Sequence, residues 1–124
     1  MVDDDDLMLK IATKFLQKEG YDVIVAGNGR DAMKIIHEAS VPFELIISDV
    51  IMPYSSGFEL VSTLKKHSLY CNIPVIIISS SGNETIVKEA YQLGVDDFLK
   101  KPIMPQELLV RVKKILSRPQ VNIS

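Results

Sequence analysis

Hydrophobic residues follow two spacings that alternate along this chain. Apolar residues three and four positions apart predict helices, whereas short, mainly β-branched runs predict buried strands. Helices are expected from Leu7 to Gly20, Asp31 to Ala39, Phe58 onward, Asn83 to Leu93 and Pro105 onward. Strands are expected at Tyr21–Ala26, Leu45–Asp49, Ile73–Ile78 and Val95–Lys100. This alternation predicts an α/β fold, a doubly wound parallel sheet with helices on both faces.

The stretch Leu45–Pro53 is the one around which the rest is organised. Its apolar run predicts a strand buried on both faces that ends at Asp49. Pro53 is expected to end any regular pairing. Such a strand delivers its last side chain to the carboxyl edge of a parallel sheet, where open α/β folds place their sites. Taken alone, Asp49 fits a solvated strand cap equally well.

Composition sets limits on the class of protein. The chain has 124 residues, 47% of them hydrophobic and 24% charged, the size and balance of one compact domain. A net charge of -2 gives no general attraction to nucleic acid or to an acidic membrane. Cys71 is the only cysteine, which favours a reducing compartment. With no signal peptide visible and no apolar run near the roughly 20 residues of a membrane span, we expect a cytoplasmic location.

Polar groups gather where the predicted strands end. Asp49, Ser79 and Lys101 each close a strand, and the run Asp3–Asp6 enters the first helix at the same edge. Carboxylates without imidazole or thiolate favour a hard cation such as Mg²⁺. Mg²⁺ beside a lysine and a hydroxyl forms a receptor for a phosphoryl group, and a carboxylate there can be the nucleophile that becomes an aspartyl phosphate.

These residues, in this order, resemble the receiver domain of two-component response regulators over almost the whole chain. The matching features are Val2-Asp3-Asp4, Asp49 followed by Met52-Pro53 and Gly57, Ser79 after Ile-Pro-Val-Ile-Ile-Ile, and Asp97-Phe98-Leu99-Lys100-Lys101-Pro102. The resemblance implies a flavodoxin-like fold. It also implies a phosphorelay function, with a histidine kinase or phosphotransfer protein as donor and a downstream output domain or protein as receiver of the signal.

The resemblance also assigns roles to individual residues. Asp49 would be the phosphoacceptor, and Mg²⁺ would be held by Asp3, Asp4, Asp49 and the backbone carbonyl of Ile51. Ser79 and Lys101 would bind the phosphoryl oxygens, and Ser79 and Phe98 would act as the switch. The Lys101–Pro102 bond is expected to be cis, and Lys100 to be a solvated neighbour. The readout face would be formed by the helix at Asn83–Leu93, the strand with Phe98 and the last helix.

The beginning of the chain departs from the family pattern. The family has a central strand ahead of the acidic pair, and only Met1-Val2 stand there. We therefore expect the first strand to be largely missing and its gap to be filled by another segment, a partner chain or a rearranged sheet. The domain is expected to span 1–118, with 119–124 as a tail or the start of a linker. A later helix start would move the metal pair to Asp4-Asp5.

Two alternatives to the phosphorylation switch stay open. One is a truncated or inert receiver-like interaction module, and the other is a phosphatase with an aspartate nucleophile. The phosphatase chemistry usually needs a second acid two residues on, where Ile51 stands. Because Ile51 and Ser81 orient water weakly, a long-lived phosphoryl form is expected. The sequence leaves open the cognate kinase, the output and whether the domain forms a homodimer.

Overall fold

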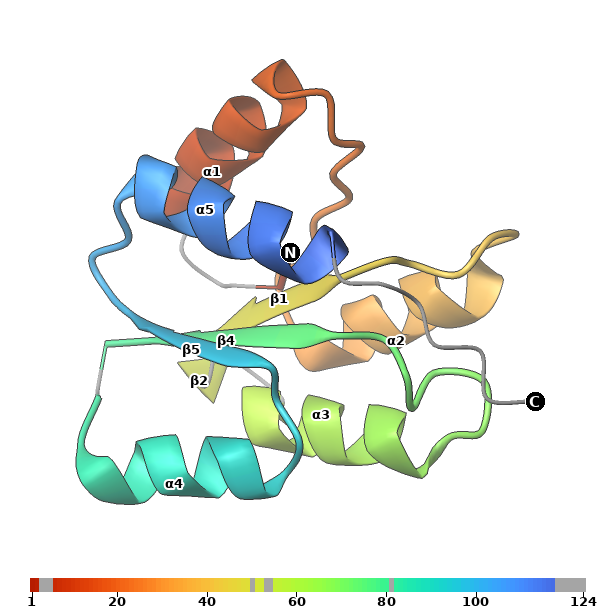
Figure 1. Ribbon diagram of the computed structural model, residues 1–124. Coiled ribbons are helices and arrows are strands. Elements are labelled where there is room, and N and C mark those ends of the chain that lie inside the picture. The colour runs from red at the N-terminus through yellow and green to blue at the C-terminus, as the bar shows by residue number, and fades with distance from the viewer. Residues whose placement is uncertain (3–5, 50, 53–54, 81, 118–124) are drawn as a thin grey trace.

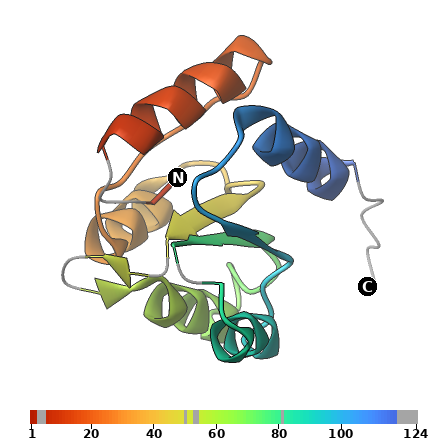
Figure 2. The ribbon, with the colours of Figure 1, turned by 90° about the vertical axis from the view of Figure 1, so that its left-hand side faces the viewer.

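The structure is a computed structural model that describes residues 1–2, 6–49, 51–52, 55–80 and 82–117. Its centre is a parallel sheet in the order β1–β4–β5, formed by β1 (Ile46–Asp49), β4 (Val75–Ser79) and β5 (Asp97–Lys100). Helices cover both faces of this sheet (Figures 1 and 2). The expected flavodoxin-like, doubly wound class is confirmed.

Five helices form the two outer layers of the described part of the chain: α1 (Asp6–Lys18), α2 (Gly29–Glu38), α3 (Gly57–Lys66), α4 (Glu84–Gln92) and α5 (Pro105–Leu116). Asn28 and Asn83 cap α2 and α4, because each side-chain oxygen accepts a hydrogen bond from a backbone N–H of the first turn. α5 begins with Pro105 and has no side-chain cap at Met104. Every predicted helix is present, with ends shifted by a few residues.

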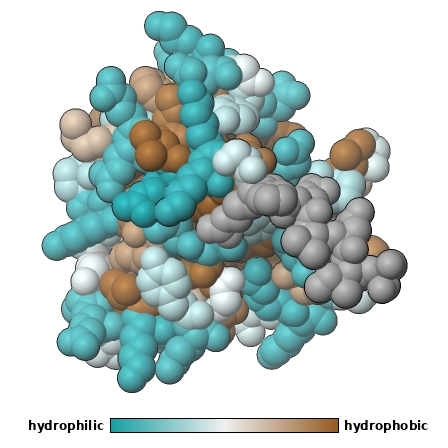
Figure 3. Space-filling view, in the orientation of Figure 1, coloured by the Kyte–Doolittle hydropathy of each residue, from teal (hydrophilic) through white to brown (hydrophobic). Residues whose placement is uncertain are grey.

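The strands divide their side chains between the two layers. Ile47, Ile76 and Ile78 face the core beneath α1 and α5, whereas Ile46 and Ile77 face the core above α2, α3 and α4. All residues of β1 and β4 are buried. This two-sided burial explains why their sequences are continuous apolar runs. No helix in the described ranges is long and apolar enough to cross a bilayer, and the face in Figure 3 shows hydrophobic atoms only in separate patches among hydrophilic ones.

The prediction of a strand at Tyr21–Ala26 is wrong. This segment forms no strand, and its pairing is a single bridge between Ala26 and Val2, which also bridges to Ser48. A strand needs a neighbour along its length, and among the described residues only Met1 and Val2 lie between this segment and β1. The expected near-absence of the first central strand therefore removes the pairing of the second strand as well.

A short hairpin after β1 was not predicted. β2 (Ile51–Met52) pairs antiparallel with β3 (Ser55–Ser56) in a separate two-stranded sheet. The expectation that regular pairing ends at Pro53 is therefore wrong. Proline forbids pairing only at its own N–H, so the chain can return and pair beyond it.

Candidate functional site

Asp49 lies at the carboxyl end of β1 with a direct cationic partner. The Nζ atom of Lys101 donates a hydrogen bond of 2.8 Å to Oδ2 of Asp49. The Asp49 side chain is 9% exposed and that of Lys101 is 19% exposed. A carboxylate this buried needs such a partner, and a small part of its side chain stays exposed to solvent.

The ends of β1, β4 and β5 converge on this pair. The sheet register places Asp49 opposite Ile78 and Ser79 opposite Lys100, so Ser79 and Lys101 follow directly at the same edge. The Lys101 N–H donates a hydrogen bond of 2.7 Å to the Ser79 carbonyl. Ser79 is 2% exposed, and the Lys101–Pro102 bond is cis, as expected. The predicted carboxylate, hydroxyl and ammonium thus come from three adjoining strand ends.

Gly57 has a role at this site that sequence reasoning missed. A Cβ atom built at Gly57 would overlap the carbonyl oxygen of Asp49 and lie 2.9 Å from its carbonyl carbon and 3.1 Å from Oγ of Ser48. The first residue of α3 therefore packs directly against the backbone of the acidic residue. From the sequence, Gly57 was identified as a feature that matches the receiver family, without a packing role. The sequence feature that could have indicated this contact is the small number of residues between the end of the buried strand and the start of the next helix.

The backbone just ahead of the acidic run is hydrogen-bonded to β1. The Asp49 N–H donates to the Val2 carbonyl at 2.8 Å, and the Val2 N–H donates to the Ile47 carbonyl at 2.7 Å. The predicted metal ligands Asp3 and Asp4 lie outside the described residues, as does Ser81. Ile51, whose carbonyl is the fourth predicted ligand, begins β2.

The described residues offer an oxygen donor of the kind that a hard cation binds. Asp49 supplies carboxylate oxygen, the ligand type that Mg²⁺ prefers. Within the described ranges, no group of three or more His, Cys, Asp or Glu residues could hold a metal. Further acidic ligands would therefore have to come from the aspartate run that directly follows Val2.

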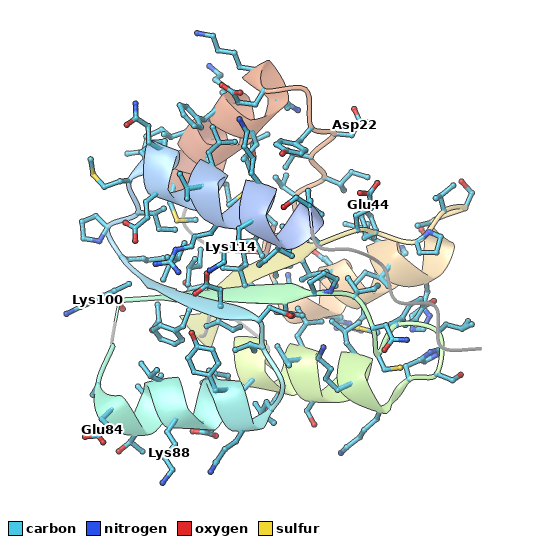
Figure 4. All side chains as sticks on the ribbon, in the orientation of Figure 1. Asp22, Glu44, Glu84, Lys88, Lys100 and Lys114 are labelled. Atoms are coloured by element: carbon cyan, nitrogen blue, oxygen red, sulfur yellow. The ribbon has the colours of Figure 1, made fainter. Side chains whose placement is uncertain are left out.

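Phe98 and Lys100 are two residues apart in β5. Phe98 is half-buried in β5, opposite Ile77, and packs against the core above α2, α3 and α4. Lys100 is exposed, and Figure 4 shows it at the end of the sheet away from Asp22 and Glu44. Its carbons lie near Gly82, where a Cβ would be 3.2 Å from Cδ of Lys100.

Comparison with known proteins identifies the class of domain. The family model for the response regulator receiver domain matches residues 1–113. The Vibrio cholerae chemotaxis response regulator CheY4 superimposes with a TM-score of 0.84 at 32% identity, covering 92% of this chain and 93% of that one. A response regulator from Chloroflexus aurantiacus gives 0.87 at 33% identity, covering 94% of each chain. The chain belongs to the receiver domain family of two-component response regulators.

Curated relatives extend beyond the region that matches. The transcriptional regulator named ycf29 of Pyropia yezoensis is 33% identical over 118 residues, which are 95% of this chain and 52% of that protein. The Staphylococcus aureus regulator SrrA is 30% identical over 120 residues, 97% of this chain and 48% of that protein. This chain therefore spans about half the length of these relatives. Receiver domains of the family are phosphoacceptor signalling domains that generally bind Mg²⁺ at the phosphorylation site.

Proposed function

We propose that Asp49 accepts a phosphoryl group and that the domain acts as a phosphorylation-driven switch. The observation that supports this most strongly is the 2.8 Å contact between Asp49 and Lys101 at the edge where β1, β4 and β5 end. The arrangement offers a carboxylate nucleophile with an ammonium already held beside it. Family membership and the solvent access of the carboxylate support the same role.

Phosphorylation forms a bond between a carboxylate oxygen of Asp49 and the phosphorus. The bond from phosphorus to the donor breaks, and the donor keeps the electron pair. A phosphohistidine of a histidine kinase or phosphotransfer protein is the expected donor. When bound, Mg²⁺ supplies positive charge for the phosphoryl oxygens, and Asp3, Asp4, Asp49 and the carbonyl of Ile51 are the proposed ligands.

Lys101 and Ser79 would then hold the transferred group. The Lys101 ammonium exchanges its contact with the Asp49 carboxylate for one with a phosphoryl oxygen, and the Ser79 hydroxyl donates to another. Hydrogen bonds to charged groups contribute roughly 1.5–3 kcal/mol each. Two such bonds approach the about 5.5 kcal/mol needed to move an equilibrium from mostly inactive to mostly active.

The proposed readout couples this exchange to Phe98. Movement of Ser79 toward the phosphoryl group would let Phe98 turn further inward, because both residues lie near the carboxyl ends of the neighbouring strands β4 and β5. The affected surface is that of α4, β5 and α5. In a longer protein, this surface would contact an output domain or a partner protein. The proposal also includes a cytoplasmic location and a homodimer.

Phosphorylation with acetyl phosphate and Mg²⁺, followed by intact-mass spectrometry, tests the proposal. The chain should gain the mass of one phosphoryl group, Asp49→Asn should gain none, and the matched surface variant Asp22→Asn should behave like the parent. No gain in the parent would favour the inert interaction module. Continuous hydrolysis of phosphate esters would favour the phosphatase. Loss of the added phosphoryl mass within seconds would contradict the prediction of a long-lived phosphoryl form.

A further inference from the structure

Lys100 is an exposed cation at the edge of the sheet that contains Asp49, and the proposed transfer step gives it no role. It ends β5 one residue before Lys101, and the register places it opposite Ser79. Residues two apart in a strand share a face of the sheet, so Lys100 lies on the face where Phe98 packs. Lys100 is therefore next to both residues that are proposed to bind the phosphoryl oxygens.

The aliphatic stem of Lys100 extends in a definite direction. A Cβ atom built at Gly82 would lie 3.8 Å from Cβ of Lys100, 3.5 Å from Cγ and 3.2 Å from Cδ. Because this distance falls from each carbon to the next, the stem extends toward the segment that joins β4 to α4. That segment begins directly after Ser79. The stem thus directs the charge of Lys100 toward the part of the chain that follows the proposed phosphoryl-binding hydroxyl.

The charge of Lys100 is not neutralised by a neighbouring carboxylate. Within the described ranges, the Lys100 ammonium takes part in no ion pair, whereas the Lys101 ammonium is bound to Asp49 at 2.8 Å. The opposite charges of that pair largely cancel for an ion that approaches from solvent. The run Asp3–Asp6 adds four carboxylates directly after Val2. An anionic phosphodonor therefore meets an excess of acidic groups, against which Lys100 supplies an exposed positive charge.

We propose that Lys100 attracts small dianionic phosphodonors, such as acyl phosphates, to the site before transfer. This inference rests on the proposed function and names a substrate class for it. The attraction between two charges is proportional to their product. A cation beside the acceptor therefore favours a donor with two negative charges over a donor with one. Lys100 acts on the approach of the donor, whereas Asp49 and Lys101 act on the transfer itself.

The position and exposure of Lys100 suit a role in the approach of the donor. A charge in solvent acts over about 10 Å at 0.1 M ionic strength. Lys100 and Ser79 lie on neighbouring strands, which are about 4.8 Å apart. The flexible side chain of Lys100 can therefore bring its ammonium within that range of a phosphoryl group bound at Ser79.

Initial rates of phosphorylation of the full chain test the proposal. Intact mass is followed at 0.1 M ionic strength and saturating Mg²⁺, with acetyl phosphate, a dianion at neutral pH, and with phosphoramidate, a net monoanion. Lys100→Met keeps an unbranched stem and removes the charge. It should lower the slope of rate against acetyl phosphate concentration about threefold. With phosphoramidate the factor should be about 1.7, the square root of three, because the charge of this donor is half as large.

Two control variants separate charge from packing and from position. Lys100→Arg keeps the charge and should restore the slope of the parent. Lys66→Met removes an exposed charge at the last residue of α3, whose first residue, Gly57, packs against Asp49. Lys66 lies about 14 Å along the helix from that contact, beyond the screening length, so the slope should stay close to that of the parent. An increase to 0.5 M salt should bring the slopes of Lys100→Met and the parent together.

The outcomes separate this inference from the proposed function. A parent that gains no phosphoryl mass would overturn the proposed function and this inference with it. If the parent is phosphorylated and Lys100→Met has the same slope, or loses the same factor with both donors, only the inference about Lys100 is overturned. The same holds if Lys100→Arg is as slow as Lys100→Met, since the shape of the side chain would then matter and not its charge.

Discussion

The two ends of the central sheet differ in how completely they are built. At the carboxyl end, β1, β4 and β5 bring Asp49, Ser79 and Lys101 together, and the Asp49–Lys101 contact measures 2.8 Å. At the amino end, the sheet opens into a groove of about 440 Å³ beside β1. The sheet therefore carries a buried ion pair at one end, whereas at the other end only β1 borders the groove.

The comparison shows which part of the fold the site depends on. β1, β4 and β5 pair along their whole length, and their residues are held between two cores. The segment 21–26 forms no strand, and Ile24 and Val25 are 52% and 44% exposed. Burial and pairing thus concentrate in the half of the molecule that carries the site. Substitutions in the two halves should therefore differ in how much they lower the free energy of unfolding.

The largest expected difference is between two isoleucines. Ile77 is fully buried at the centre of β4, whereas Ile24 is 52% exposed beside the groove. Ile77→Ala should lower the free energy of unfolding by about 3–4 kcal/mol, because it removes buried methyl groups and leaves a cavity. Ile24→Ala should cost less than about 1 kcal/mol. Urea unfolding followed by circular dichroism measures both, and equal losses would contradict the division between the two halves.

The next effect concerns the contact between α3 and the acidic strand end. Gly57→Ala would push a methyl group into the Asp49 carbonyl, which is backbone and can move only with β1. We expect a loss of about 3 kcal/mol and slower phosphorylation, because Asp49 would shift relative to Lys101. Gly27→Ala is the matched control, since nothing lies within 4 Å of its added carbon. Parent-like stability and phosphorylation in Gly57→Ala would contradict the proposed packing role.

The carboxyl-edge residues could be predicted because strand ends are local features of the sequence. Asp49, Ser79 and Lys101 each follow an apolar run, and parallel pairing alone brings such ends to one edge. The contact of Gly57 with Asp49 could not be found in this way. It depends on the pairing of β2 with β3 between β1 and α3, which the sequence did not predict.

The strand at Tyr21–Ala26 failed for a different physical reason. Its sequence has the β-branched residues of a strand, and local propensity was correctly identified. A strand is nevertheless a property of a pair, and the residues that would pair with it are reduced to Met1 and Val2. Because the first strand was expected to be largely missing, the loss of pairing at Tyr21–Ala26 could have been predicted as well.

Stability should depend on pH through the Met1 amino group, which donates a hydrogen bond to the Ile24 carbonyl. Burial lowers the pKa of this amino group from 8.0 to about 6. The folded chain then binds fewer protons than the unfolded chain between these two values, so stability rises with pH across that window. The rise is roughly 3 kcal/mol for a shift of two pKa units, complete above pH 8 and lost below pH 6.

Acetylation of the amino terminus separates this effect from other titrating groups. An acetylated chain has no ammonium to titrate, so the difference in unfolding free energy between the two forms should change across pH 6–8. Urea unfolding at pH 5.5, 7 and 8.5 measures that difference. A difference that is constant across this range would contradict burial of a titrating amino group beside the Ile24 carbonyl.

The smallest effect tests how firmly β5 is joined to α5. Arg111 contacts the Asp97 carboxylate at 3.1 Å, with side chains 38% and 12% exposed. Arg111→Met keeps most of the apolar stem and should cost about 1 kcal/mol, because the half-exposed guanidinium is partly screened by solvent while Asp97 keeps its hydrogen bond from the Phe98 N–H. If charge attraction causes this loss of stability, the loss should be smaller in 0.5 M salt, where the screening length is about 4 Å.

The more exposed Lys113–Glu19 pair, at 3.8 Å, provides the comparison, and Lys113→Met should have no measurable effect. If Arg111→Met also had no measurable effect on stability, α5 would be held to β5 by apolar packing alone. The ion pair would then contribute no stability.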